Sequence, residues 1–241
     1  MMPKLNLKKI ILFFCGFILF LSILHRILSF SPFLFAYISL VFAVIFLLTP
    51  ELVLARLTPE NQDKPQIKLW QHSLLKSIIW GVATSVILLG AYWLLHYFWF
   101  KYSCPGNSGF SLGRNCSNYH STFTYPFSLL KSLDLLAFQL IIVAFPEEFF
   151  YRGFLQPLLY KSTQLQRFTG FKKIGAAIFL QALLFAVGHF LIDFNPMRLS
   201  VFFPALFFGF IAWKSKSILA PIIFHTAANY ISLLLENGFF N

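Results

Sequence analysis

The sequence predicts an all-α integral membrane protein, a polytopic bundle of about seven transmembrane helices. Of its 241 residues, 58% are hydrophobic and only 11% are charged, against about 25% charged in an average soluble domain. These few charges cannot cover the surface of a water-soluble globule of this size. Much of the apolar surface must therefore face lipid. Seven mostly apolar windows are long enough to cross a bilayer. They are residues 10–28, 32–48, 74–100, 133–160, 174–192, 199–213 and 218–235.

The basic residues predict the orientation of these windows, because cytoplasmic loops retain Lys and Arg. We predict that the amino terminus is cytoplasmic. In that orientation the outer loops hold only a minority of the 19 basic residues, and Arg152 lies within a window. The outer residues are Arg26, Lys101, Arg114, Lys131 and Arg198. The first window follows two lysines, as in a signal peptide, but it ends without a small-x-small cleavage site, which favours an uncleaved anchor.

The formal charge of +11 does not indicate a nucleic-acid partner. The basic residues form short clusters between apolar runs, and no basic stripe could follow a phosphate backbone. We therefore expect no nucleic acid as a partner. The chain shows no internal repeat or low-complexity linker, so residues 1–241 are interpreted as a single integral membrane domain.

Residues 101–127 form the one long polar loop, and the predicted orientation places this loop outside the cytoplasm. Cys104 and Cys116 lie within it. In an oxidising compartment a disulfide between them would stabilise the fold by about 3 kcal/mol. Two unpaired thiols are the alternative.

Two of the eight acidic residues, Glu147 and Glu148, lie well within the fourth window. An ionised carboxylate at such a depth costs about 2.5 to 3.5 kcal/mol, a cost normally tolerated for function. Glu148 and Arg152 are four residues apart with the acid first, the better order for an ion pair on one helix face. Glu147 is rotated about 100° from that face. We interpret Glu148 and Arg152 as a structural pair and Glu147 as an available proton acceptor.

Three other polar side chains lie inside later windows. His189 is in the fifth, where Gly188 leaves room for a close neighbour, and His225 and Asn229 share one face of the seventh. At about 1.5 Å of rise per residue, these three and Glu147 reach a similar depth. A lone buried histidine is usually a packed core residue, but agreement in depth on three windows predicts a site. We expect the four side chains to converge around one hydrated pocket.

These residues resemble the three motifs of the CAAX-prenyl-protease and bacteriocin-processing family of intramembrane proteases, also called the abortive-infection or CPBP family. The order, the spacing and the placement on three windows all agree, and residues 133–235 would be the catalytic core. The matching residues are Glu147, Glu148 and Arg152 for EExxxR, Phe185 and His189 for FxxxH, and His225 and Asn229 for HxxxN.

The resemblance implies a glutamate-type endopeptidase. In such an enzyme Glu147 and His189 would activate a water molecule, and His225 and Asn229 would donate hydrogen bonds to the developing oxyanion. The intramembrane ion pair would hold the helix geometry. The residue types and their spacing predict the same division into an available base, a paired acid and two convergent donors.

Other mechanisms and functions stay open at this point. A glutamate and two histidines could also hold zinc, but the chain has no HExxH motif and asparagine is a poor zinc ligand, so we predict no cofactor and rank zinc second. A proton-coupled transporter or a non-catalytic scaffold is the alternative outside the enzymes. Transporters usually carry matching unusual positions in two halves, whereas here the unusual polar residues all follow residue 132.

The substrate that the resemblance implies is a membrane-associated peptide or protein at the lipid bilayer. Family members act on CAAX-like carboxyl-terminal segments, on bacteriocin leaders or, in the myxosortase-like branch, on sorting signals. For this short chain we favour a multi-pass enzyme of the bacterial cytoplasmic membrane.

Overall fold

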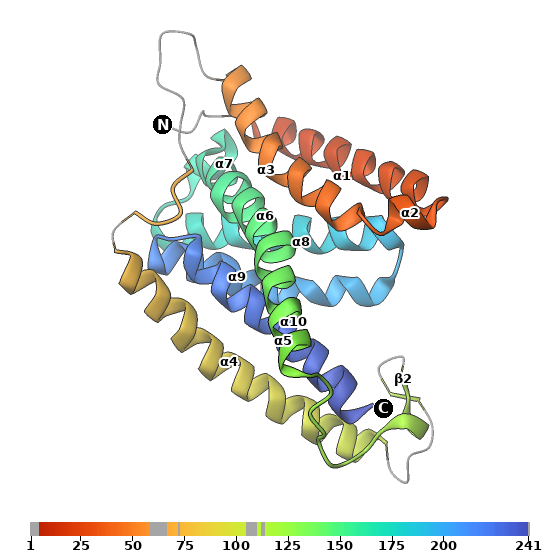
Figure 1. Cartoon of the computed structure of the whole chain (residues 1–241). Coiled ribbons are helices and arrows are strands. Elements are labelled where there is room, and N and C mark those ends of the chain that lie inside the picture. Colours follow the sequence, from red (N-terminus) through yellow and green to blue (C-terminus); the bar gives the residue numbers. More distant parts are fainter. Residues whose placement is uncertain (1–4, 58–66, 72, 105–109, 112–113, 241) are drawn as a thin grey trace.

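The computed structural model describes residues 5–57, 67–71, 73–104, 110–111 and 114–240, and these residues form a helical bundle (Figure 1). The helices come from long apolar runs whose backbone groups must be paired within the segment wherever lipid replaces water. The elements in chain order are α1 (Leu7–Ser29), α2 (Pro32–Phe35), α3 (Ile38–Leu57), α4 (Leu74–Ser103), β1 (Phe110–Ser111), β2 (Arg114–Asn115), η2 (Cys116–Asn118), α5 (Leu129–Phe138), η3 (Gln139–Ala144), α6 (Phe145–Glu148), η4 (Phe149–Leu155), α7 (Gln156–Lys161), η5 (Thr163–Arg167), α8 (Gly170–Asp193), η6 (Pro196–Val201), α9 (Phe202–Ser215) and α10 (Leu219–Phe239).

Within the described residues, seven helical segments are long and apolar enough to cross a membrane, which confirms the predicted fold class. Six of them lie within a few residues of the predicted windows. The second differs, because Pro32–Phe35 forms a separate helical turn and Ile38–Leu57 continues past Leu48, where the predicted window ends. Pro50 is buried inside this helix. A proline removes one backbone hydrogen bond but does not stop a helix that neighbours hold in place.

The fourth span, Leu129–Lys161, is one continuous helical segment in which two π-helical segments interrupt the α-helical winding. The segments η3 and η4 are π-helical, and each is followed by a proline, Pro146 in α6 and Pro157 in α7. A proline has no N–H to donate four residues back and its ring pushes that carbonyl away. The wider π winding accommodates both effects, and it flanks the two glutamates.

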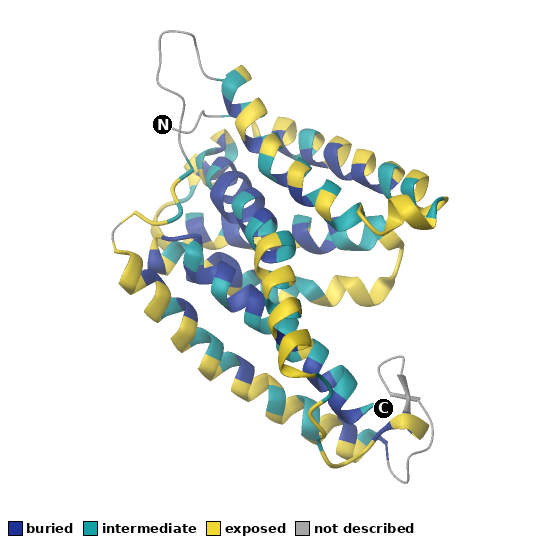
Figure 2. Ribbon diagram, viewed as in Figure 1, coloured by how far each residue is buried: buried dark blue, intermediate teal, exposed yellow. Residues whose placement is uncertain are grey.

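The fourth span lies in the middle of the bundle (Figure 1). On one side it contacts α3 and α8, and α1 packs on α8; on the other side α10 runs along α4 and contacts η3. The side chains buried between α1, α3 and the fourth span include an aromatic cluster in which the ring of Phe150 lies 4.8 Å from that of Phe17 and 5.2 Å from that of Phe46. Figure 2 shows that burial follows α7 and α10, while one face of α4 is exposed.

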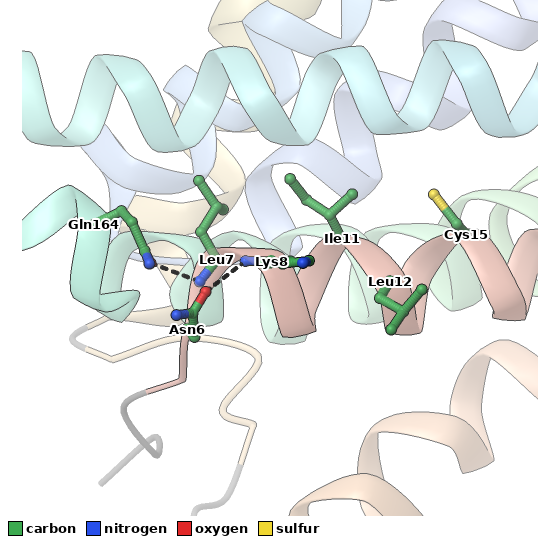
Figure 3. A pocket seen from close by; sticks show the side chains of 7 residues that line it. All are labelled: Asn6, Leu7, Lys8, Ile11, Leu12, Cys15 and Gln164. Carbon is green, nitrogen blue, oxygen red and sulfur yellow. Dashed lines mark hydrogen bonds between the residues drawn. The ribbon is translucent and has the colours of Figure 1, made fainter.

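The start of α1 is fixed to the loop between α7 and α8 (Figure 3). Asn6 Oδ1 accepts a hydrogen bond from the Lys8 amide at 2.9 Å, and Gln164 Oε1 accepts one from the Leu7 amide at 2.7 Å. These bonds satisfy two amides that have no partner within the helix. The face of α1 seen in Figure 3 also carries Cys15, which is exposed.

The loop between α4 and α5 is attached to the end of α10. Cys104 and Cys116 are joined by a disulfide and are buried with Phe239. The His120 amide donates to the Phe239 carbonyl at 2.8 Å, and a Cβ on Gly238 would collide with the Phe123 ring. This loop also carries the two-residue strands β1 and β2, which pair antiparallel.

Candidate active site

A buried carboxylate, Glu148, joins two helices at the centre of the bundle. Its Oε1 atom accepts hydrogen bonds from Arg152 Nη1 at 2.8 Å and from His225 Nδ1 at 2.8 Å. The side chains of Glu148 and Arg152 are both fully buried. The ion pair expected from the four-residue spacing is therefore present, and it is also the anchor for a residue of α10.

The guanidinium of Arg152 lies between two aromatic rings. Its central carbon is 4.8 Å from the centroid of the Phe185 ring and 5.0 Å from that of the Phe208 ring. Arg152 Nη2 also donates to the Ala205 carbonyl at 3.3 Å. Ring faces and a carbonyl are negative surfaces that offset part of the cost of removing a cation from water. The arginine thus connects the fourth span to α8 and α9.

Glu147 faces away from this ion pair, as the rotation between neighbouring helix positions requires. Its Oε2 atom lies 3.9 Å from His225 Nε2, too far for a hydrogen bond but close enough for an electrostatic interaction. The side chain of Glu147 is 16% exposed, and Oε2 is buried without a hydrogen bond to any described residue. The exposed part of this carboxylate can accept a hydrogen bond from a water molecule or a substrate in a neighbouring cavity.

The imidazole of His225 is held by one stacking contact and one hydrogen bond. The ring is stacked on Phe208, with centroids 4.6 Å apart and planes at 20°. Because the Glu148 carboxylate already accepts from Arg152, the Nδ1 atom of His225 is the donor in their contact. The neutral imidazole therefore carries no proton on Nε2, the nitrogen that faces Glu147, and Nε2 becomes a donor only in the imidazolium form.

His189 is oriented by its own helix. Its Nδ1 atom lies 3.0 Å from the Phe185 carbonyl, which can only accept, so Nδ1 carries the proton and Nε2 of the neutral ring is an acceptor. The Phe185 ring lies 4.3 Å from the His189 ring and 6.3 Å from the His225 ring. Gly188, next to His189, allows α8 to pack closely against the fourth span, since a Cβ there would lie 3.1 Å from Tyr151 Oη.

Asn229 contacts a residue that lies outside the three motifs. Its Nδ2 atom donates to Gln139 Oε1 at 2.8 Å. Gln139 is the first residue of the π-helical segment η3. The contact fixes which end of the Asn229 amide is the donor, and it leaves the second Nδ2 hydrogen available.

One cavity of about 980 Å³ brings the predicted residues together. Glu147, His189, His225 and Asn229 all line it, as do Gln139 and Phe185. The rest of its wall is mainly apolar. The buried ion pair does not line the cavity and lies behind it. The structure thus brings the four expected side chains to one pocket, while their catalytic roles remain predictions.

A metal centre was the second expectation for these side chains. Among the residues that the structure describes, no three His, Cys, Asp or Glu side chains are grouped as ligands of one ion. The contact of His225 Nδ1 with Glu148 leaves Nε2 free and does not argue against a metal, but Asn229 is bound to an amide and is a poor zinc ligand. We therefore derive no step that uses a metal.

The sequence reasoning missed three contacts of this site. The Glu148–His225 hydrogen bond joins positions 77 residues apart, and the Asn229–Gln139 bond joins positions 90 residues apart. The third is the packing of Phe208 against Arg152 and His225. Gln139, a polar residue inside the fourth window, was the one available signal, and Phe208 gave none among 33 phenylalanines.

Comparison with known proteins gives one match. Residues 129–231 match the family model Rce1-like, described as type II CAAX prenyl endopeptidase Rce1-like. No curated protein and no solved structure matches the chain. The matched residues are fewer than half of the chain and contain all three motifs, and the match supports the predictions of a CPBP-type chain and of a protease. The myxosortase-like branch is not distinguished by this match and stays a prediction.

Proposed function

We propose that this chain, whose residues 129–231 match the Rce1-like model of type II CAAX prenyl endopeptidases, hydrolyses a peptide bond with a water molecule activated by Glu147. The observation that carries the proposal is the shared cavity. Glu147, His189, His225 and Asn229 line it, while the charge of Glu148 is already paired. One carboxylate is therefore left to act on a molecule in the cavity.

The first step is proton transfer. Glu147 takes a proton from water while the water oxygen attacks the carbonyl carbon of the scissile bond. The bare Nε2 of His189 accepts the second hydrogen of this water and orients it. Glu147 suits this task because it lines the cavity and its nearest charged partner, His225 Nε2, is 3.9 Å away.

The second requirement is stabilisation of the oxyanion that the attack creates. Asn229 offers the Nδ2 hydrogen not used by Gln139, and imidazolium His225 offers Nε2–H. Both donors are held by other side chains before substrate binds, so little reorganisation is needed. Collapse of the intermediate then breaks the carbon–nitrogen bond, and the leaving amine takes the proton from Glu147. The products are a carboxylate and an amine.

The substrate is a membrane-associated peptide or protein, as for other proteases of this family. We propose a short segment at the bilayer, a sorting signal, a leader or a CAAX-like tail, and a bacterial cytoplasmic membrane as the location. The largely apolar wall of the cavity supports this choice, since an apolar segment loses little solvation on entering it.

The experiment that tests the proposal compares the membrane peptides of cells that express the wild-type chain with those of cells that express Glu147→Gln. Peptides that end at a new terminus should appear with the wild type and be lost with Glu147→Gln. Glu51→Gln is the matched control, because Glu51 is exposed on α3. Products that persist with Glu147→Gln would refute the assigned base.

A further inference from the structure

The active-site cavity reaches only one face of the bundle. On α8 and α10 the cavity is lined only by residues from Phe185 and Phe224 onward, in the later part of each helix. On α4 only residues between Leu88 and Leu95 line it. On α9 and the fourth span, which run the other way, it stops at Phe208 and Glu147. No described residue of the opposite part of these five helices lines the cavity. The cavity therefore extends from mid-bilayer to the face where α8 and α10 end.

The rim of the cavity at this face is polar. Asp193 and Arg198 form an ion pair of 3.0 Å there, and both side chains are partly exposed. Ser200, Ser232 and Glu236 also line this end. Water can reach such a polar rim.

The opposite part of the bundle is closed. Below Glu147, the fourth span buries Glu148, Arg152 and Gln156, and α8 buries Gln181 with no exposed surface. At that face the Leu69 carbonyl accepts the Ile218 amide at 2.9 Å and so covers the start of α10. Access from this side would require separation of the most tightly buried part of the protein.

The open face carries the disulfide. Cys104 follows directly after α4, and the segment after Cys116 is hydrogen-bonded to the end of α10 through the His120 and Thr124 amides. Disulfides persist in oxidising compartments outside the cytoplasm. The closed face carries the clustered lysines, among them Lys161, Lys172 and Lys173, which mark the cytoplasmic side. The disulfide and the charge distribution are independent features, and they assign the same orientation.

We propose that the active site takes its substrate from the extracytoplasmic side, as a peptide segment that lies in the outer leaflet and emerges at that surface. The apolar wall, including Tyr92, Phe203 and Phe207, would hold the membrane-embedded part. The Asp193–Arg198 pair would lie beside the part that emerges into water. This inference rests on the proposed function, because only a protease takes a peptide substrate here. The side from which the cavity is accessible can nevertheless be measured without catalysis.

The test is labelling of single cysteines with a membrane-impermeant maleimide, in a Cys15→Ser background that keeps the disulfide. Ser232→Cys lies on the exposed rim one turn beyond Asn229, and Lys172→Cys is the control on the closed face. In sealed right-side-out membranes, Ser232→Cys should be labelled and Lys172→Cys should not. In inverted vesicles the pattern should reverse. Both cysteines should react after denaturation, which shows that each variant is present.

Labelling of Ser232→Cys only in inverted vesicles, or from neither side, would overturn the proposal. Adding Glu147→Gln should leave the labelling unchanged, so a failed assignment of the base would not alter this result. Conversely, maleimide on Ser232→Cys should abolish cleavage of peptides identified with the wild type, while maleimide treatment of the Cys15→Ser protein should leave that cleavage intact.

Discussion

His225 Nδ1 lies 2.8 Å from Glu148 Oε1, so the carboxylate that pairs with the buried arginine also fixes the imidazole at the cavity. One oxygen atom thereby links the EExxxR and HxxxN motifs. The second glutamate of the first motif is a positioning residue, because it reaches the cavity only through His225. The two adjacent glutamates should therefore respond differently to the same substitution.

We expect Glu148→Gln to lose both stability and activity. The amide removes the charge that pairs with buried Arg152, and breaking one member of a buried pair costs about 3 to 5 kcal/mol. Glu147→Gln is the matched control, since Oε2 of Glu147 makes no hydrogen bond to the described residues. It should lose cleavage but keep the thermal unfolding midpoint in detergent. A Glu148→Gln protein with the midpoint and turnover of the wild type would contradict the positioning role.

Asn229 and Gln139 should act as a donor and its support. Removal of an oxyanion donor lowers turnover by roughly 10² to 10³ fold, so Asn229→Ala should fall in this range. Gln139→Leu leaves the donor in place but removes the acceptor at 2.8 Å that orients it. We expect a smaller loss in kcat with little change in KM. Gln139→Glu keeps an acceptor and should restore kcat; equal loss in Gln139→Leu and Gln139→Glu would show that orientation of Asn229 is not the cause.

His189→Ala should lower turnover by roughly 10² to 10⁴ fold, the usual range for loss of a group that assists proton transfer. Stability should change little, because the described hydrogen bond of this imidazole goes to a carbonyl of its own helix. His25→Ala is the control, since that ring contacts only the rings of Phe35 and Phe42 among its described aromatic neighbours and lies far along α1 from the cavity. Turnover unchanged in His189→Ala would exclude His189 from water activation.

The sequence predicted the helices well where charge and length set the ends of a span. Apolar runs bounded by lysines, such as the one that became α4, need only the thickness of the bilayer to be recognised. The prediction was wrong for the second span, whose window ends at Leu48, whereas the helix continues through Pro50 to Leu57. The π winding before Pro146 was also not predicted, because it depends on how neighbouring helices hold the freed carbonyls.

For the site, the sequence predicted the residues that must share a depth but not the contacts between helices. Helical spacing is a local property, so it paired Glu148 with Arg152 correctly and rotated Glu147 away from both. The hydrogen bonds to His225 and from Asn229 to Gln139 depend on the rotation of α10 about its own axis. Packing of side chains such as Phe208 sets that rotation, and no spacing rule encodes it.

Metal removal should leave the enzyme active. The proposed mechanism uses a carboxylate, two imidazoles and an amide, and the described residues offer no cluster of three metal-binding side chains. Active protein washed with a chelator should keep its turnover while elemental analysis finds metal far below one ion per chain. Loss of activity that stoichiometric zinc restores would instead support the zinc-dependent mechanism.

The disulfide should support stability and not catalysis. Cys104 and Cys116 close a short loop and are buried beside Phe100 and Phe239, and a loop of this size stabilises a fold by about 3 kcal/mol. Cys104→Ser/Cys116→Ser protein should therefore unfold at a lower temperature in detergent, and reductant should lower the midpoint of the wild type but not of the double variant. Cys15→Ser, on an exposed face of α1, is the control and should change neither quantity.

Turnover of the double variant separates two roles of the loop. The disulfide lies at the end of α4, and neither cysteine lines the cavity. Turnover below the unfolding temperature should therefore match that of the wild type. If the double variant keeps the wild-type midpoint but loses turnover, the loop acts on the substrate at the rim, and stabilisation of α4 against α10 is not its main function.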